Sequence, residues 1–554
     1  RTEADLPKGG TLVIGEASQE VNGGETPDFR ARNIVLSAVA PSLPEAFNSD
    51  GTLPAEAQQG MLLSTRSTEQ GGFSTVRLFS NDTITIPGTT QFRLAPGGTF
   101  SALANSTINV AGSINILSGD VSLKSRESSI QLAPGTQINV QGGWVNNSPL
   151  INATASNAPV LIDGGNITLA AFNNLVVGAN SQLDASGGGW VDSNNKLTAG
   201  KGGEIRLSSA GVDDAGNMLG SVNVEGKLLS YGLFEGGALT VTAPSVKIGG
   251  NPSGTLGEFW IDPATFRQGG FASYNLSGIN DLEIAAGTQI RPQMLNRILD
   301  ASYLIRPTGT DVSAFSSIGF LDELFRNPVS LTLASTSSLS PLGLGNLTMG
   351  AGSSIITDPR ASVSLSAREN LNVFGTIDAP AGHISLHVAP GVVVGADDIN
   401  EGFVSGQHLL VGSGARLQAR SIPQIWKDSA DGLRKGRVLD AGSVVLNANK
   451  GTLILESGSL IDVSGVSGEI DQFTPSSVQT IAVAGAGGEI NLHTREGLAI
   501  KGDLLGKAAS VPGAAGGSLS IGLDLYNRSQ NPNASIQSPP EICHRPQPGQ
   551  RAEP

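Results

Sequence analysis

The sequence predicts an all-β protein that folds as a right-handed parallel β-helix with two short helical excursions. Three observations lead to this fold class: short aliphatic runs, glycine-rich corners between them, and their recurrence. Residues 441–468, AGSVVLNANKGTLILESGSLIDVSGVSG, show three such runs in one period of roughly 20 to 25 residues. A repeat of that length is typical of a solenoid, whose coils bury their apolar faces only by stacking. The right-handed sense is expected because parallel crossovers are almost always right-handed.

Each repeat has an opening half and a closing half. The opening half is Gly-Gly followed by an alternating strand, as in GGNITLA, GGEIRLS and GGEINLH. The closing half is an aliphatic residue, Asp or Asn, a small apolar residue and a turn, as in LDASGG, IDAPAG and IDVSG. Asp184, Asp378 and Asp462 therefore hold one structural position, and we expect them to hydrogen-bond backbone groups at a corner instead of binding a ligand.

Composition supports a β-rich solenoid and narrows the function classes. Gly accounts for 73 of the 554 residues, and no apolar run reaches the ~20 residues that a membrane helix needs. The net charge of −14 repels phosphate backbones, so we expect no nucleic-acid partner. Cys543 is the only cysteine, which excludes an intramolecular disulfide and a cysteine-based metal site. We expect neither a cofactor nor a bound metal.

We expect residues 1–527 to form one interrupted array of coils. The strand pattern breaks at about 41–70, where helix formers follow Pro54, and at 292–328, where apolar residues recur at helical spacing. Both stretches are predicted to be helical insertions. Residues 528–554 change to Pro, Gln, Arg and Ser without periodicity and are predicted to be disordered.

Sequence signals for catalysis are weak. There is no P-loop, no Gly-x-Ser-x-Gly elbow and no His-Glu-x-x-His motif. His383 and His387 resemble a helical ligand pair, but in a strand they lie ~13 Å apart, too far to share one metal. The alternative function is a carbohydrate-active β-helix enzyme, for which the paired acids 213–214 and 397–398 would be the candidates. Both pairs fall in predicted turns without nearby aromatic residues, so we expect no enzymatic activity.

The GGxIxL and IDVSG/LDASGG phrases, in a Gly- and Asn-rich background, resemble the filamentous-haemagglutinin-like exoproteins of two-partner secretion in Gram-negative bacteria. The resemblance covers residues 9–525 and implies a secreted or cell-surface adhesin with a parallel β-helix. It also implies export by an outer-membrane barrel transporter and attachment to a host-surface or glycan receptor that the sequence does not identify. The family's amino-terminal secretion domain carries Asn-Pro-Asn motifs, whereas the matches here, at 251–254 and 531–534, lie far from the start. We therefore expect an internal or carboxy-terminal piece of a longer exoprotein.

One edge of the solenoid is the predicted functional surface. Insertions follow the closing half of the repeat at 144–159, 190–201 and 467–485, and one corner of a stacked solenoid lies along one edge. The first two insertions begin alike, which places Trp144 and Trp190 at equivalent positions. Exposed aromatic residues are common interface anchors, so we predict that these two residues and the third insertion face a ligand. The alternative is that this corner simply tolerates insertions and that the two rings cover the adjacent core.

Overall fold

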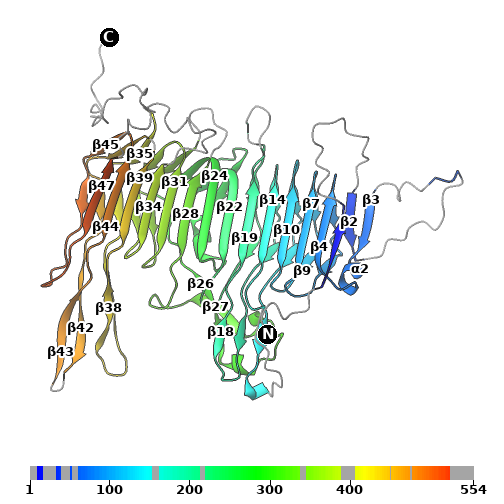
Figure 1. Cartoon of the computed structure of the whole chain (residues 1–554), viewed down its shortest axis with the longest axis horizontal. Helices are drawn as coiled ribbons and strands as arrows, with labels where there is room; N and C mark the ends of the chain where they lie inside the picture. The colour runs from blue at the N-terminus through cyan, green and yellow to red at the C-terminus, as the bar shows by residue number, and fades with distance from the viewer. Residues whose placement is uncertain are drawn as a thin grey trace, which may run out of the picture.

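The structure, a computed structural model, describes residues 9–15, 33–38, 50–52, 60–151, 161–211, 217, 219–336, 345–388, 406–449, 451–474 and 477–523. It is all-β, and its main sheets are parallel. Strands of successive coils stack side by side along the long axis of the molecule (Figure 1). The chain therefore forms a parallel β-helix, which confirms the predicted fold class.

The first face of the solenoid receives a strand from each described coil. Its strands, in spatial order, are β1 (Gly10–Ile14), β4 (Phe73–Ser80), β7 (Thr99–Ala104), β10 (Asp120–Ser125), β14 (Asn166–Ala171), β19 (Glu204–Ser209), the first halves of β22 (Ala238–Ile248) and β24 (Ser273–Ile284), β28 (Ser330–Ser335), β31 (Ser362–Ala367), β34 (His383–Val388), β39 (Ser443–Ala448), β44 (Glu489–Thr494) and β47 (Ser518–Leu523).

The second face has two parts. The amino-terminal part is a seven-stranded sheet of β3 (Gly60–Ser64), β2 (Asn33–Ser37), β5 (Ile84–Ile86), β8 (Ile108–Val110), β11 (Ile130–Leu132), β15 (Leu175–Val177) and β20 (Val222–Val224). The carboxy-terminal part consists of β23 (Glu258–Ile261), the second halves of β22 and β24, β29 (Asn346–Met349), β32 (Leu371–Val373), β35 (His408–Val411), β40 (Thr452–Leu455) and β45 (Gly497–Ile500). Because β22 and β24 continue through the corner, this part joins the first face in one 20-stranded sheet.

The third face closes each coil. It comprises a five-stranded sheet of β6 (Gln91–Arg93), β9 (Ser113–Asn115), β12 (Gln137–Asn139), β16 (Gln182–Asp184) and β21 (Lys227–Leu229), and a six-stranded sheet of β25 (Gln289–Ile290), β30 (Ser354–Ile356), β33 (Thr376–Asp378), β36 (Arg416–Gln418), β41 (Leu460–Asp462) and β46 (Asp503–Leu505).

Segments that leave the third face make up the remaining strands. They are β13 (Trp144–Asn146), β17 (Gly189–Val191), β18 (Leu197–Ala199), β26 (Leu295–Leu299), β27 (Ser316–Phe320), β37 (Ile422–Lys427), β38 (Arg434–Leu439), β42 (Ser467–Phe473) and β43 (Val478–Ala484), with the 3₁₀ turns η2 (Pro149–Ile151), η4 (Ala301–Ile305) and η5 (Val312–Phe315).

The coil strands alternate buried and solvent-facing residues because successive side chains of a strand point to opposite faces of the sheet. In β31, Val363, Leu365 and Ala367 are almost completely buried, while the serines between them are partly exposed. Leu365 pairs in register with Leu386 of the next coil, so aliphatic side chains form continuous columns inside the solenoid. Each fully buried Leu or Ile contributes roughly 1.5–3 kcal/mol, and the stacking of coils is what removes it from water.

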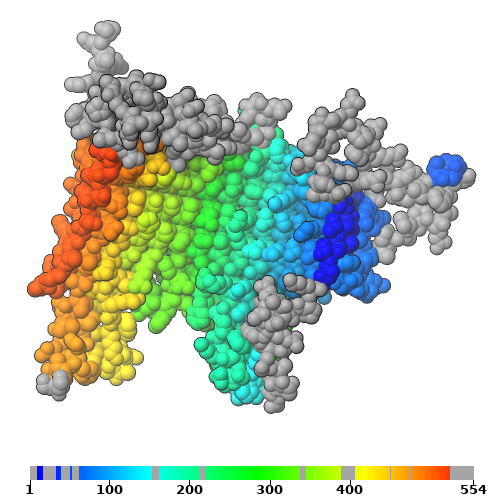
Figure 2. Space-filling view, in the orientation of Figure 1, coloured from blue at the N-terminus to red at the C-terminus, as the bar shows by residue number. Residues whose placement is uncertain are grey.

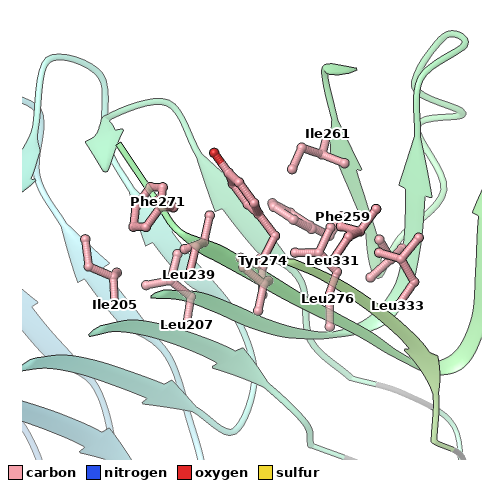
Figure 3. Close-up of a cluster of buried hydrophobic side chains, with 14 of the residues drawn as sticks. Ile205, Leu207, Leu239, Phe259, Ile261, Phe271, Tyr274, Leu276, Leu331 and Leu333 are labelled. Carbon is pink, nitrogen blue, oxygen red and sulfur yellow. The ribbon is translucent and has the colours of Figure 1, made fainter. Parts of the chain in front are cut away.

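Aromatic residues fill the middle of the solenoid, where the amino-terminal sheets of the second and third faces end and their carboxy-terminal sheets begin. There β23 and the 3₁₀ turn η3 (Pro263–Arg267) fill the space between the two parts. Tyr274 is 1% exposed, its hydroxyl donates to the carbonyls of Thr265 and Gln268 at 3.0 Å, and its ring contacts Phe266 and Phe271 edge to face. Figure 3 shows Tyr274 among aliphatic residues of neighbouring coils. Large rings thus replace a regular coil here without leaving the core open.

The two ends of the solenoid differ. At the amino-terminal end β3 extends the second face and the α-helix α2 (Thr65–Gln70) packs against β4 and β6. At the other end Leu519 and Ile521 of β47 occupy core-facing positions opposite Ile490 and Leu492, yet they are 51% and 45% exposed. In the described ranges, no helix is long and apolar enough to cross a lipid bilayer.

The predicted helical insertions need correction. Within 41–70 the structure has the strand β3 and only the short helix α2, and residues 41–49 and 53–59 lie outside the described residues. Within 292–328 it has the antiparallel pair β26–β27 with two 3₁₀ turns. Cross-strand pairing overrides the helical spacing of the apolar residues there. The predicted disorder of 528–554 also lies outside the described residues.

Candidate functional site

Five excursions in the described ranges leave the solenoid at the same corner. They follow β12, β16, β25, β36 and β41, each a strand of the third face, and the chain then returns to the first face. Figure 1 shows β18, β26, β27, β38, β42 and β43 on one side of the rod, and Figure 2 shows two separate projections on that side. We call the set β13, β17–β18 and β26–β27, with η2, η4 and η5, the middle module, and the pairs β37–β38 and β42–β43 the twin hairpins.

The middle module has an apolar core of its own. Trp144, Val191, Val312 and Phe315 are buried together, apart from the core of the solenoid. The indole of Trp144 is 2% exposed and lies 4.9 Å from the ring of Phe315, and its Nε1 donates to the carbonyl of Arg306 at 3.1 Å. Because these residues come from three different excursions, the excursions form one packed unit.

A buried amide fastens the first excursion to the third. The Nδ2 of Asn146 donates to the carbonyl oxygens of Arg306 at 2.8 Å and Leu304 at 3.0 Å, and its backbone amide donates to Thr308 Oγ1 at 3.0 Å. Asn146 is 2% exposed. Its hydrogen bonds therefore satisfy backbone groups that would otherwise be buried without partners.

An ion pair anchors the middle module to the body of the solenoid. Arg326, beyond β27, donates from Nε and Nη2 to the two carboxylate oxygens of Asp358, both at 2.6 Å. The two side chains are only 9% and 7% exposed. Pairing with Asp358 raises the pKa of Arg326. A bidentate, buried pair of this kind fixes orientation as well as distance.

The twin hairpins are joined by charged groups nearer to solvent. Arg434 donates to Glu469 Oε2 at 2.6 Å and to Asp471 Oδ1 at 3.0 Å, and its backbone amide donates to the other oxygen of Asp471. Thr480 also donates to Asp471. The hydrogen bonds from Arg434 hold the pKa of Asp471 well below its usual range. The side chain of Arg434 is 39% exposed, so water and salt screen these pairs.

Close packing at one glycine also holds the twin hairpins together. A Cβ atom on Gly468 would lie 2.5 Å from Cδ1 of Ile425 and 3.1 Å from Cγ2 of Val438. Any larger residue at this position would have to displace the side chain of Ile425. Within the first hairpin, Lys435 pairs with Asp428 at 2.6 Å and with Asp431 at 2.8 Å, which lowers the pKa of both carboxyls.

Several large apolar side chains on this edge face solvent. In the twin hairpins they are Phe473 at 70%, Val478 at 46% and Trp426 at 45% exposure. In and beside the middle module they are Leu150, Ile298, Ile305, Ile318, Phe320 and Phe325. Rings that are exposed on rigid projections are suited to anchor a protein or glycan surface.

The two predicted tryptophans are close in the structure but differ in exposure. They lie on neighbouring strands, since Trp190 pairs with Val145, the residue after Trp144. Trp144 is buried in the middle module, so its ring is not available to a ligand. This position agrees with the alternative in which the ring covers an apolar core. Trp190 is partly exposed, and its Nε1 is buried without a hydrogen-bond partner among the described residues. The third predicted insertion, 467–485, is the β42–β43 hairpin.

Sequence reasoning missed Trp426 and Phe473 as the exposed rings of the twin hairpins. Residues 421–435 stand out in the sequence only as a polar interruption of the repeat. Neither Ile422–Lys427 nor Arg434–Leu439 alternates apolar and polar residues, and Pro423 and Gly436 are unfavourable within strands, so no local pattern marks this hairpin.

Two of the three predicted corner carboxylates, Asp184 and Asp462, make the expected local hydrogen bonds, whereas the side chain of Asp378 makes none among the described residues. Asp184 accepts from the backbone amide of Ser186 at 2.9 Å, and Asp462 accepts from that of Ser464 at 2.9 Å. Asn139, one coil before Asp184, accepts from the backbone amide two residues ahead in the same way. In each case a side-chain oxygen accepts a hydrogen bond from the backbone amide two residues ahead. Asp and Asn can both form this turn, because each has such an oxygen.

Burial raises the pKa of two of these carboxyl groups, those of Asp184 and Asp378. The second oxygen of Asp184 accepts from Gln141 Nε2 at 2.9 Å, and Asp378 is half-buried. Neither lies in the exposed part of the edge.

The predicted histidines bond to neighbouring coils. His383 Nδ1 lies 2.7 Å from Ser443 Oγ, and His387 Nε2 lies 3.3 Å from Asn449 Nδ2. Burial lowers the pKa of His387. No group of three or more His, Cys, Asp or Glu side chains in the described ranges is placed to hold a metal. The paired acids 213–214 and 397–398 lie outside the described residues.

Comparison with known proteins adds no relative to this picture. The chain matches no protein-family model, and neither the curated proteins nor the solved structures contain a match to it.

Proposed function

We propose that this chain is a secreted or cell-surface β-helical adhesin that attaches to its partner through the edge formed by the middle module and the twin hairpins. The observation that carries the proposal is the position of the five excursions, all at one corner of the repeat. In repeat proteins, insertions on one face are commonly the binding face.

The construction of the edge supports attachment. Buried rings, the Asn146 hydrogen bonds and the Arg326–Asp358 pair hold the middle module in place, and Arg434 joins the twin hairpins. A surface that is rigid before binding loses little conformational entropy on association. The exposed rings of Trp426 and Phe473 supply apolar anchors on that rigid frame.

The repeat phrases that resemble two-partner-secretion exoproteins support the cellular part of the proposal. They suggest export through an outer-membrane barrel transporter to the surface of a Gram-negative bacterium. The single cysteine agrees with such a route, since no internal disulfide would prevent threading of the unfolded chain. The receptor is a host-surface protein or glycan.

Truncation of the twin hairpins tests the proposal. Residues 422–439 and 467–484 are each replaced by a Gly-Gly turn, and beads coated with the purified chain are allowed to bind epithelial monolayers and one another. We expect attachment to fall about tenfold or more, the loss that follows from removing one strong anchor. Circular dichroism should show an unchanged β-rich rod.

Point variants give a matched control. Phe473→Ser and Trp426→Ser remove exposed apolar groups from the edge, whereas Leu256→Ser removes one that is even more exposed, at 77%, from the loop between β22 and β23. Attachment should fall for the first two variants and stay unchanged for the third. Full attachment by a folded truncated chain would disprove the assignment of the edge.

A further inference from the structure

A groove runs across the amino-terminal part of the second face, away from the edge described above. It has a volume of about 550 Å³ and spans coils from β5 to β20 at the corner where the second face meets the third. The long direction of the groove follows the stacking axis, since its walls come from equivalent positions of successive coils. A ligand lying in it would cross the strands instead of running along one of them.

Small residues at the corner create the hollow. Ala111, Ala133 and Gly178 follow β8, β11 and β15 at the same position of three successive coils. At Gly178 no side chain fits, because a Cβ atom would lie 2.7 Å from the carbonyl oxygen of Leu132. Val176 and Pro134 add further apolar surface to the walls. The groove is therefore built into the coils and does not depend on a loop.

The floor of the groove carries polar side chains without partners. Thr85, Asn109 and Gln131 stand next to one another in register on β5, β8 and β11. None of the three side chains makes a hydrogen bond within the part of the chain that the structure describes. Their donors and acceptors all face the groove or solvent at a spacing of about 4.8 Å, the distance between neighbouring strands.

An equivalent amide elsewhere on the second face is used differently. Asn372 is the middle residue of β32, as Asn109 is of β8, and its Oδ1 lies 2.8 Å from Nε2 of His408 on the next coil. Asn109 and Gln131 are also on adjacent coils but do not bond to each other. The groove thus presents three free polar groups where the fold could have paired them.

The charge of the groove restricts the class of ligand. No Lys or Arg is among the described residues that line it, and Glu225 is its one carboxylate. With a net charge of −14 on the whole chain, a phosphate, sulfate or uronate polymer would be repelled. A peptide strand is also disfavoured, because the strands of this face are already paired on both sides and offer no backbone groups.

From these observations we infer that the groove binds an uncharged, extended glycan along the axis of the rod. Hydroxyl groups of such a chain both donate and accept, which matches the free hydroxyl of Thr85 and the amides of Asn109 and Gln131. The apolar faces of sugar rings pack on Ala111, Ala133 and Val176. This site is separate from the edge of the proposed function, and either can exist without the other.

An array of neutral and anionic oligosaccharides, probed with the whole chain, tests the inference. The neutral arm holds α- and β-linked hexose and N-acetylhexosamine hexamers, and the anionic arm holds uronate and sulfated hexamers. We expect binding to at least one neutral hexamer and to no anionic one, and the affinity for the best neutral hexamer is then measured by isothermal titration.

Three variants locate the binding. Asn109→Ala with Gln131→Ala removes two hydrogen-bonding groups and should weaken the affinity about tenfold or more. Ala133→Trp fills the hollow and should abolish binding. Asn491→Ala removes an outward amide from β44 on the first face, outside the groove, and should change nothing.

Three results would overturn the inference: no binding to any neutral hexamer, equal binding by the Ala133→Trp variant, or stronger binding to the anionic arm. Attachment through the twin hairpins is measured separately and should be normal in the groove variants. Failure of the groove and failure of the edge are therefore distinguishable.

Discussion

The middle module and the twin hairpins leave the same corner of the repeat but are stabilised by different forces. The middle module encloses Trp144 and Phe315 and is tied to the body by an ion pair that is less than a tenth exposed. The twin hairpins are joined through Arg434, which is 39% exposed, and they expose Trp426 and Phe473. The middle module thus buries Trp144 and Phe315, although Phe320 remains 40% exposed, whereas the twin hairpins leave Trp426 and Phe473 exposed.

This difference assigns different roles to the two projections. Aromatic residues buried in the middle module stabilise its shape and cannot also contact a ligand. The aromatic residues on the twin hairpins remain 45% and 70% exposed after folding, so the surface that is still in contact with water can be buried in binding. The middle module is expected to resist salt and acid, whereas the geometry of the twin hairpins depends on charge.

Removal of the Trp144 ring should have the largest effect on the middle module. Trp144→Ala leaves a cavity and removes one of the two hydrogen bonds to the carbonyl of Arg306, and we expect a loss of about 3–5 kcal/mol in the local stability of the module. Hydrogen exchange of the amides in β26 and β27 measures it. Trp144→Phe, which keeps most of the apolar volume, should lose less. Unchanged exchange in Trp144→Ala would mean that the ring does not hold the module together.

Breaking the Arg326–Asp358 pair should have the next largest effect. Arg326→Leu or Asp358→Leu leaves one buried charge without a partner, at a cost of about 3 kcal/mol. The double variant Arg326→Leu with Asp358→Leu removes both charges and should be markedly more stable than either single variant. Chemical denaturation of all four proteins gives the coupling energy. Additive losses would show that the pair is not coupled as the geometry indicates.

Acid should loosen the twin hairpins and spare the middle module, the smallest of the three effects. Pairing lowers the pKa of Asp471 in the folded chain below the unfolded value of about 3.9. The resulting stabilisation is therefore fully present above about pH 4 and is lost as the pH falls through the lowered pKa of the folded state.

Hydrogen exchange in β42 and β43, corrected for the intrinsic rate, should accordingly rise between pH 5 and pH 3. Arg434→Gln should already exchange faster at pH 5 and respond less to acid, and 1 M NaCl should act in the same direction as acid. Equal protection of wild-type β42 at both pH values would contradict the dependence on charge.

The fold could be predicted from sequence because its determinants are local. Phrases such as GGEINLH encode a turn and an alternating strand within seven residues, and Ile490 and Leu492 lie inside the solenoid as their alternation predicts. The Asp-containing corners are local as well, since Asp184 and Asp462 bond to amides two residues ahead. Such short-range rules need no knowledge of distant contacts.

Features that depend on distant contacts could not be predicted from sequence. The apolar residues at 292–328 match helical spacing, but β26 pairs with β27, and Val312 and Phe315 of η5 pack against Trp144. No local pattern encodes a contact between residues so far apart in the sequence. The same contact decides that Trp144 is buried, although its equivalence with Trp190 is visible in the sequence. The sequence pattern was enough to identify the corner at which the excursions leave the solenoid. The exposure of each aromatic ring at that corner depends on distant contacts and could not be predicted.

Because of the hydrogen bonds of Asn146, assembly of the middle module depends on the correct stacking of the coils. Asn146 and Arg306 are 160 residues apart, and the coils from β14 to β24 lie between them in the chain. Their side chain and carbonyl meet only after all these coils have stacked, because the closure of so long a loop is otherwise entropically costly. A skipped coil would shift the two segments by about 4.8 Å, more than a hydrogen bond tolerates. The hydrogen bonds of Asn146 can therefore form only when the intervening coils are complete and stacked in register.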